Sequence, residues 1–135
     1  MVASGGELSR IMLAVKSVLA DKDEVETLIF DEIDTGISGR TAQKVSEKMA
    51  VLGKRHQVLC ITHLAQIAAM ADAHYLIEKQ TKDQKTTTNI RLLGPEEEIQ
   101  ELARILGGAE ITEAVYQTAA EMKQLAEKTK KENNR

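Results

Sequence analysis

Residues 27–34 have the sequence TLIFDEID, and this stretch decides the fold. Residues 27–30 form a short, continuous apolar run, as expected of a strand covered on both faces. Asp31 and Glu32 follow directly and give the strand a polar end. A second apolar run, VLCIT at 58–62, predicts another buried strand. Between the two runs, apolar residues lie on one helical stripe: Ala42, Val45, Met49 and Leu52. Strand, helix and strand in this order predict a βαβ unit in a parallel sheet.

A helix is expected before this unit. Ser4 and Glu7 have the spacing of a capping box, in which the serine caps the helix and the glutamate reaches back to it. Apolar residues then recur at helical intervals: Leu8, Ile11, Met12, Val15 and Leu19. The pattern predicts a helix that runs to about residue 20.

After the second strand, the sequence predicts a short helix, a hairpin and two longer helices. The short helix is expected at about 64–71, the hairpin strands at 75–78 and 86–93, and their polar turn at 82–85. Gly94, Pro95 and three glutamates then open a helix through residue 106, which two glycines close. The last helix is expected to decay into a polar tail at 128–135. The fold class is therefore α/β, a mainly parallel sheet flanked by helices, with one domain over 1–127 that ends in a hairpin and helices.

The composition limits the functions that the chain can have. Of its 135 residues, 42% are hydrophobic and 29% charged, which is typical of a globular domain. A net charge of −3 and an aromatic content of 2% argue against a broad DNA-binding surface and against base stacking. The single cysteine, Cys60, excludes an internal disulfide and is expected to be a small core residue. No signal peptide and no membrane-length apolar run is found, so we expect a cytoplasmic location and no membrane partner.

A glycine pair marks the start of the first helix, in the string SGGE at 4–7. The glycines let the backbone approach a ligand closely, and the free N–H groups and the helix dipole favour a phosphate there. A capped helix with a flexible entry explains the same residues without a ligand. Alone, this string favours neither interpretation.

Polar side chains follow each predicted strand. Asp31 can hold Mg²⁺ through water, and Glu32, which points the other way, can orient or deprotonate an attacking water. A plain polar exit from a strand is the alternative for both. His63 follows the second strand and can contact a phosphate or a catalytic water at the same edge of the sheet. A lone histidine before a helix is more often a structural cap.

Together, the order and spacing of these groups resemble the second half of an ABC ATPase head. Its signature motif, Walker B motif and switch histidine resemble SGGE at 4–7, LIFDE at 28–32 and ITH at 61–63. The string DEID at 31–34 is similar to the SMC-like branch of these ATPases. Residues 30–40 and 61–72 closely resemble the bacterial RecN family of double-strand-break repair, and the resemblance extends through 106–108.

The resemblance implies a role for each candidate residue. The nucleotide-binding residues that it implies are Ser4, Gly5, Gly6, Glu7 and Ser38. The first three of these would contact the γ-phosphate of ATP held by a partner head. Residues 35–38 would form the loop that crosses the dimer seam, and Ser38 stands where most heads carry an aspartate. Asp31 would serve the Mg²⁺ site, Glu32 would be the catalytic base, and His63 would sense the γ-phosphate.

No G-x-x-x-x-G-K-[ST] string occurs in the chain, so it offers no loop that cradles the β- and γ-phosphates. The resemblance therefore implies a longer protein, whose N-terminal head half with the Walker A loop lies upstream of Met1. That protein would hydrolyse ATP with Mg²⁺ in a dimer of heads that acts on DNA at the nucleoid. This chain alone is expected to be inactive.

Two other interpretations stay open. The chain can be a non-catalytic module that docks onto a complementary N-terminal half. It can also be a metal-dependent enzyme of the Toprim type that uses Asp31, Asp34 and another acid. The Toprim fold needs a glutamate on an earlier strand, and the sequence predicts no strand before 27–30.

Overall fold

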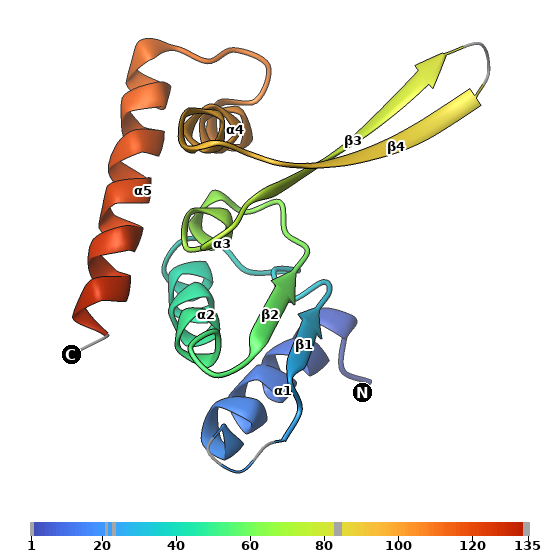
Figure 1. Ribbon diagram of the computed structural model, residues 1–135, viewed down its shortest axis with the longest axis vertical. Helices are drawn as coiled ribbons and strands as arrows, with labels where there is room; N and C mark the ends of the chain where they lie inside the picture. The colour runs from blue at the N-terminus through green and yellow to red at the C-terminus, as the bar shows by residue number, and fades with distance from the viewer. Residues whose placement is uncertain (1, 21, 23, 83–84, 134–135) are drawn as a thin grey trace.

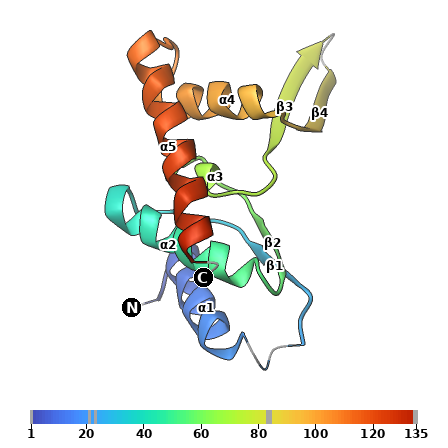
Figure 2. The same ribbon diagram turned by 60° about the vertical axis from the view of Figure 1, so that its left-hand side comes forward.

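The structure, a computed structural model, describes residues 2–20, 22, 24–82 and 85–133. Its elements, in chain order, are α1 (Gly5–Leu19), β1 (Thr27–Phe30), α2 (Gly39–Leu52), β2 (Gln57–Cys60), α3 (Ala65–Ala69), β3 (Tyr75–Lys82), β4 (Lys85–Leu92), α4 (Pro95–Gly107) and α5 (Glu113–Glu132). β1, β2, α1 and α2 lie together at one end of the molecule, and the β3–β4 hairpin projects from the other (Figure 1). α5 runs beside α4, α3 and α2 (Figure 2). None of the described helices has both the length and the apolarity needed to cross a membrane.

The capping box predicted for α1 is confirmed. The Glu7 amide donates to the Ser4 hydroxyl at 3.2 Å, and the Ser4 amide donates to the Glu7 carboxylate at 2.9 Å. The apolar stripe predicts which face of α1 packs against the protein, but the residues that α1 buries are Gly6 and Leu13, which lie outside the stripe. The stripe itself is exposed: Leu8, Ile11, Met12, Val15 and Leu19. Local sequence therefore predicts the start of α1 but not the face that packs.

β1 and β2 pair in parallel, with Leu28 opposite Val58 and Phe30 opposite Cys60. The predicted βαβ unit is confirmed. The main core contains these strands and side chains from three helices: Leu13, Leu28, Phe30, Ile33, Val45, Met49, Leu52 and Ile67. This cluster covers one face of the strand pair.

The prediction that both strands are covered on both faces is wrong for the described chain. Along β1, burial alternates, and Ile29 is 67% exposed. Its partner Leu59 is 45% exposed on the same face. β2 is also shorter than predicted. After Ile61 donates its amide to the Phe30 carbonyl, the ladder has no further partner, because the chain leaves β1 at Asp31.

The hairpin is confirmed, with strands that pair from Tyr75 opposite Leu92 to Lys82 opposite Lys85. β3 is longer than predicted because antiparallel pairing continues through polar residues near the tip, whereas β4 has the predicted length and begins one residue earlier. Part of the predicted turn, residues 83–84, lies outside the described residues. The described strands thus form one two-stranded parallel sheet and one two-stranded antiparallel sheet.

α4 and α5 pack on α3 in a second core, which includes Leu102, Ala103, Ala119 and Ala126. α5 does not end where the polar tail was predicted but continues to Glu132. The Lys130 ammonium holds it in place, donating to the Asp72 carboxylate at 2.9 Å. Residues 134–135 of the predicted tail lie outside the described residues.

Candidate functional site

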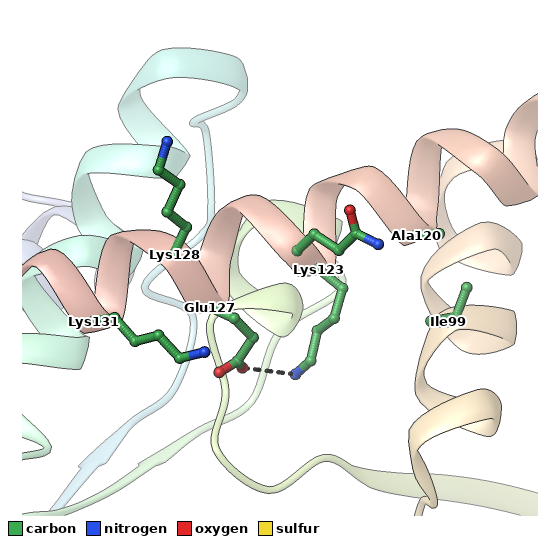
Figure 3. Close-up of a pocket in the computed structure, with 7 residues that line it drawn as sticks. Ile99, Ala120, Lys123, Glu127, Lys128 and Lys131 are labelled. Atoms are coloured by element: carbon green, nitrogen blue, oxygen red, sulfur yellow. Dashed lines mark ion pairs between the residues drawn. The ribbon is translucent and has the colours of Figure 1, made fainter.

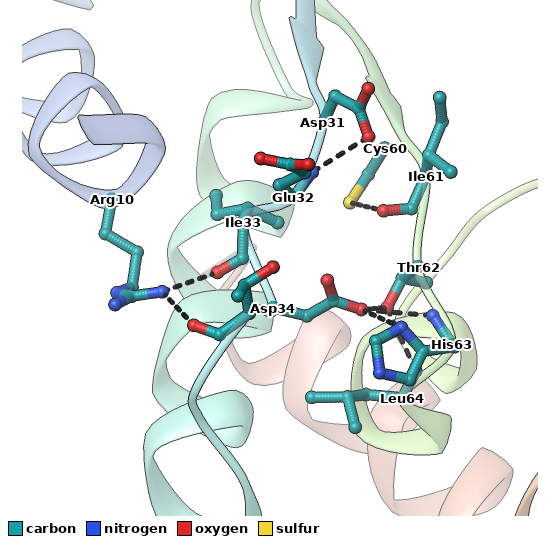
Figure 4. A network of polar contacts seen from close by, with 11 residues as sticks. Arg10, Asp31, Glu32, Ile33, Asp34, Cys60, Ile61, Thr62, His63 and Leu64 are labelled. Atoms are coloured by element: carbon teal, nitrogen blue, oxygen red, sulfur yellow. Dashed lines mark hydrogen bonds and ion pairs between the residues drawn. The ribbon is translucent and has the colours of Figure 1, made fainter. Parts of the chain in front are cut away.

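The start of α1 is fastened to the loop that follows β1. The Ser9 hydroxyl donates to the Asp31 carbonyl at 2.9 Å. The Arg10 guanidinium donates to the carbonyls of Ile33 at 3.1 Å and Thr35 at 2.8 Å. Figure 4 shows Arg10 reaching from α1 toward this loop. The start of α1, which carries the signature-like string, and the acidic loop after β1 are therefore joined by hydrogen bonds and form one connected unit within this chain.

Both carboxylates at the end of β1 are exposed. The Asp31 carboxylate accepts the Glu32 amide at 2.9 Å. Glu32 has φ 57°, a left-handed conformation that is uncommon for a residue other than glycine, and it turns the chain away from β1. The Glu32 carboxylate lies directly beside Gly5, where it would contact any side chain placed there. The structure thus brings together two residues of one head that the resemblance assigns to two different ATP sites, Glu32 to the site of its own head and Gly5 to the site of the partner head.

Asp34 connects this loop to the end of β2. Its side chain is 4% exposed, and Oδ2 accepts the Thr62 hydroxyl at 2.6 Å and the His63 amide at 3.0 Å. The same oxygen lies 3.2 Å from His63 Nδ1, while the His63 side chain is 81% exposed. Burial raises the pKa of Asp34, but the hydrogen bonds from Thr62 and His63 and the charge of His63 outweigh it, so the pKa is below its ordinary value. Figure 4 shows these groups converging on one carboxylate oxygen.

The remaining predicted residues lie at helix starts. Ser38 is the N-cap of α2, and its side chain makes no capping hydrogen bond. Ser4 and Glu7 bond to each other's backbone at the start of α1. Their capping role, which needs no ligand, is therefore present in the chain itself.

Among the described residues, no group of three or more His, Cys, Asp or Glu side chains is arranged to hold a metal ion. Mg²⁺ commonly binds to one or two protein carboxylates and takes its other ligands from water and substrate phosphates. The exposed carboxylate of Asp31 fits that mode. The Toprim interpretation fits less well, because the Asp34 oxygen is occupied by Thr62 and His63.

Two surface depressions among the described residues lie elsewhere. One is lined by Ile99 of α4 and by residues of α5: Ala120, Lys123, Gln124, Glu127, Lys128 and Lys131 (Figure 3). Lys123 there is neutralised by Glu98 at 2.8 Å and by Glu127 at 3.8 Å. None of the lining residues comes from the loops that follow β1 and β2. Asp31, Glu32 and His63 in these loops are exposed, which suits a site that another protein surface completes.

No protein-family model matches the chain. Over 129 residues it is 48% identical to the DNA repair protein RecN of Bacillus subtilis (strain 168), in an alignment that covers 96% of the chain and 22% of that protein. It is 54% identical over 107 residues to the DNA repair protein RecN of Treponema pallidum (strain Nichols), covering 79% of the chain and 19% of that protein. The corresponding protein of Haemophilus influenzae is 49% identical over 121 residues, 90% of the chain and 22% of that protein.

The chain corresponds to a segment of the RecN family. It spans about a fifth of the length of the curated relatives that it matches. The family resemblance inferred from the motifs is thereby confirmed, and it extends over nearly the whole segment.

Sequence reasoning missed the residues that hold this RecN-type segment's loops in place. Ser9 and Arg10 lie two and three residues after the signature-like string, and Asp34 lies within the DEID string. Their roles depend on partners more than 20 positions away in the chain. Only the structure places those partners within hydrogen-bonding distance.

Proposed function

We propose that this chain is the C-terminal part of an ATPase head in a RecN-type DNA repair protein. The head would hydrolyse ATP once an N-terminal half supplies the Walker A loop and a second head closes the site. The observation that carries this proposal is the connected unit formed by α1 and the loops after β1 and β2. Arg10 and Asp34 hold the three predicted motifs of this unit together.

In the proposed reaction, Glu32 orients and deprotonates the attacking water. Its exposed carboxylate at a strand end is available to solvent, as a general base in an open half-site must be. Asp31 would hold Mg²⁺, which neutralises phosphate charge when it is bound. His63, also exposed, would contact the terminal phosphate or the attacking water. We assign Ser4, Gly5 and Gly6 to nucleotide on the opposing head, where the start of α1 can offer N–H donors to an anion.

The uncovered face of the β1–β2 pair supports the proposal that another segment completes the head. Ile29, Leu59 and Ile61 are all about half exposed or more. Single exposed apolar residues are ordinary, but neighbouring ones on one sheet face form a surface suited to packing. We propose that the N-terminal half of the same protein covers it. Action on DNA in repair, at the nucleoid, belongs to the full-length protein in this proposal.

The test is Glu32→Gln in the full-length protein, with Glu26→Gln as the matched control. Glu26 is an exposed glutamate next to β1 and lies outside the proposed site. Loss of a general base lowers the turnover rate by roughly 10²–10⁴-fold, and ATP binding should persist. Glu26→Gln should leave both unchanged. Loss of ATP affinity with an unchanged rate per bound ATP would exclude Glu32 as the base.

A non-catalytic docking module is the alternative, and the same experiment distinguishes it. If the full-length protein shows no hydrolysis that depends on Glu32, the chain serves only to complete another segment's fold. Turnover by the 135-residue chain alone, removed by Glu32→Gln, would contradict the proposal that the site needs a Walker A loop from elsewhere.

A further inference from the structure

The Asp34 carboxylate is surrounded by donors from a single short segment. Oδ2 accepts from the Thr62 hydroxyl and the His63 amide and lies 3.2 Å from His63 Nδ1. The Thr62 hydroxyl in turn accepts the Leu64 amide at 3.1 Å. The Thr62 hydroxyl has one hydrogen and donates it to Asp34, so it can only accept from Leu64. The donor and acceptor of each hydrogen bond in this series are therefore determined. The segment before α3 is therefore held in one conformation.

The chemistry of this contact determines which nitrogen of His63 carries a proton. An ionised carboxylate presents only lone pairs, so with Nδ1 3.2 Å from Oδ2 a proton on Nδ1 is favoured over a lone pair there. The other neutral tautomer would place the lone pair of Nδ1 against the carboxylate and is unfavourable. With Nδ1 protonated, Nε2 of the neutral ring carries a lone pair and can accept a hydrogen bond.

We propose that Asp34 is a positioning residue that holds His63 in the Nδ1–H tautomer and orients its ring, so that Nε2 is the atom offered to the reaction. The proposal rests on the proposed function only in giving His63 a part in hydrolysis. The orientation and the tautomer are properties of this chain by itself. Asp34 acts through His63 and is not expected to touch nucleotide.

The direct test is nitrogen NMR on the 135-residue chain with ¹⁵N-labelled histidine, at a pH at which the ring is neutral. His63 is assigned by its loss in His63→Gln. In the parent chain, His63 should show a protonated Nδ1 and an unprotonated Nε2. In Asp34→Asn, the signals should move toward the Nε2–H tautomer. The same tautomer in both chains would overturn the proposal.

Thr62→Val is the matched control. It removes the other side-chain donor to Asp34 and leaves the carboxylate beside His63, so the Nδ1–H tautomer should persist. Signals of His56 and His74 report on the fold, and they should be unchanged in both variants. A tautomer change of equal size in Thr62→Val would show that loss of local packing, not loss of the carboxylate, is responsible, and would also overturn the proposal.

A double-mutant cycle in the full-length protein tests the consequence. Asp34→Asn should lower ATP turnover by about 10–100-fold, the range typical of residues that orient a functional histidine. In a His63→Ala background it should add little, because the residue through which it acts is absent. Independent, multiplicative losses would overturn the positioning role. Full turnover by His63→Ala would instead refute the proposed role of His63, and the NMR result would still decide the tautomer.

Discussion

The two glycines at the start of α1 should respond oppositely to alanine. A Cβ at Gly6 would lie 2.9 Å from the Glu32 carbonyl oxygen, 2.9 Å from Thr35 Cβ and 3.1 Å from the Arg10 guanidinium. A Cβ at Gly5 would meet only the exposed Glu32 side chain, which can rotate away. We therefore expect Gly6→Ala to destabilise the chain and Gly5→Ala to be tolerated.

The magnitude follows from two opposing effects. Glycine to alanine in a helix stabilises a protein by about 0.4–1 kcal/mol, mainly through the entropy of the unfolded chain. Overpacking costs typically about 1–3 kcal/mol, and it applies at Gly6 because its neighbours are a backbone oxygen and a Cβ in a loop fastened by Arg10. The helical gain is common to both variants and cancels in their difference. Gly6→Ala should therefore be less stable than Gly5→Ala by about 1–3 kcal/mol.

Urea unfolding of the chain and both variants, followed by circular dichroism, measures this difference. The midpoints should differ and the slopes should agree, since neither change alters the surface exposed on unfolding. If Gly6→Ala is as stable as Gly5→Ala or more so, the close contact between α1 and the acidic loop is not present in solution. A confirmed difference would mean that packing within this chain suffices to explain a glycine at position 6.

Three further outcomes are expected. Burial and nearby carboxylates raise the pKa of Cys60 to about 12, so its alkylation by iodoacetamide at neutral pH should be far slower than that of a small free thiol; equal rates would contradict this. Lys123→Met removes the ammonium that pairs with the part-buried Glu98 and should lower the free energy of unfolding by about 1–3 kcal/mol. Lys128→Met, at an exposed position, is its control and should change the free energy of unfolding by less than about 0.5 kcal/mol. Ile29→Thr should alter the stability of this chain by no more than about 1 kcal/mol, because the side chain already lies largely in water; a larger loss would show that its face is covered.

The parts of the fold that the sequence predicted are those that short-range patterns determine. The capping box needs only Ser4 and Glu7, and both hydrogen bonds are present. The predicted helix ends and the hairpin likewise depend on neighbouring glycines, on Pro95 and on polar residues. The end of α5 could not be predicted, because the polar residues beyond 128 do not themselves favour a packed helix. Lys130 stays helical through its bond to Asp72, a residue 58 positions earlier.

The candidate site divides in the same way. Asp31, Glu32 and His63 are candidates because of their residue types, their positions at strand ends and the resemblance of their motifs to an ATPase head. Their mutual arrangement could not be predicted, because it depends on which carboxylate of DEID turns inward. Asp34 is that residue, and its burial follows from donors that Thr62 and His63 present across the strand ends. The buried carboxylate of Asp34, and not an exposed motif residue, therefore links the two loops of the site.

The wrong prediction for β1 has a physical meaning of its own. Continuous apolar residues at 28–30 are typical of a strand with both faces covered, yet Ile29, Leu59 and Ile61 are 67%, 45% and 55% exposed. Full burial of one such side chain is worth about 1.5–3 kcal/mol, so completing the cover would add several kcal/mol to a domain whose total stability is typically about 5–15 kcal/mol. The pattern thus suits a larger core than these residues build, and the relatives are about five times as long as the segment that matches.

If another segment covers this face, Ile29→Lys should be tolerated in this chain and should destabilise the full-length protein by several kcal/mol. Equal effects in the two proteins would show that the face stays open.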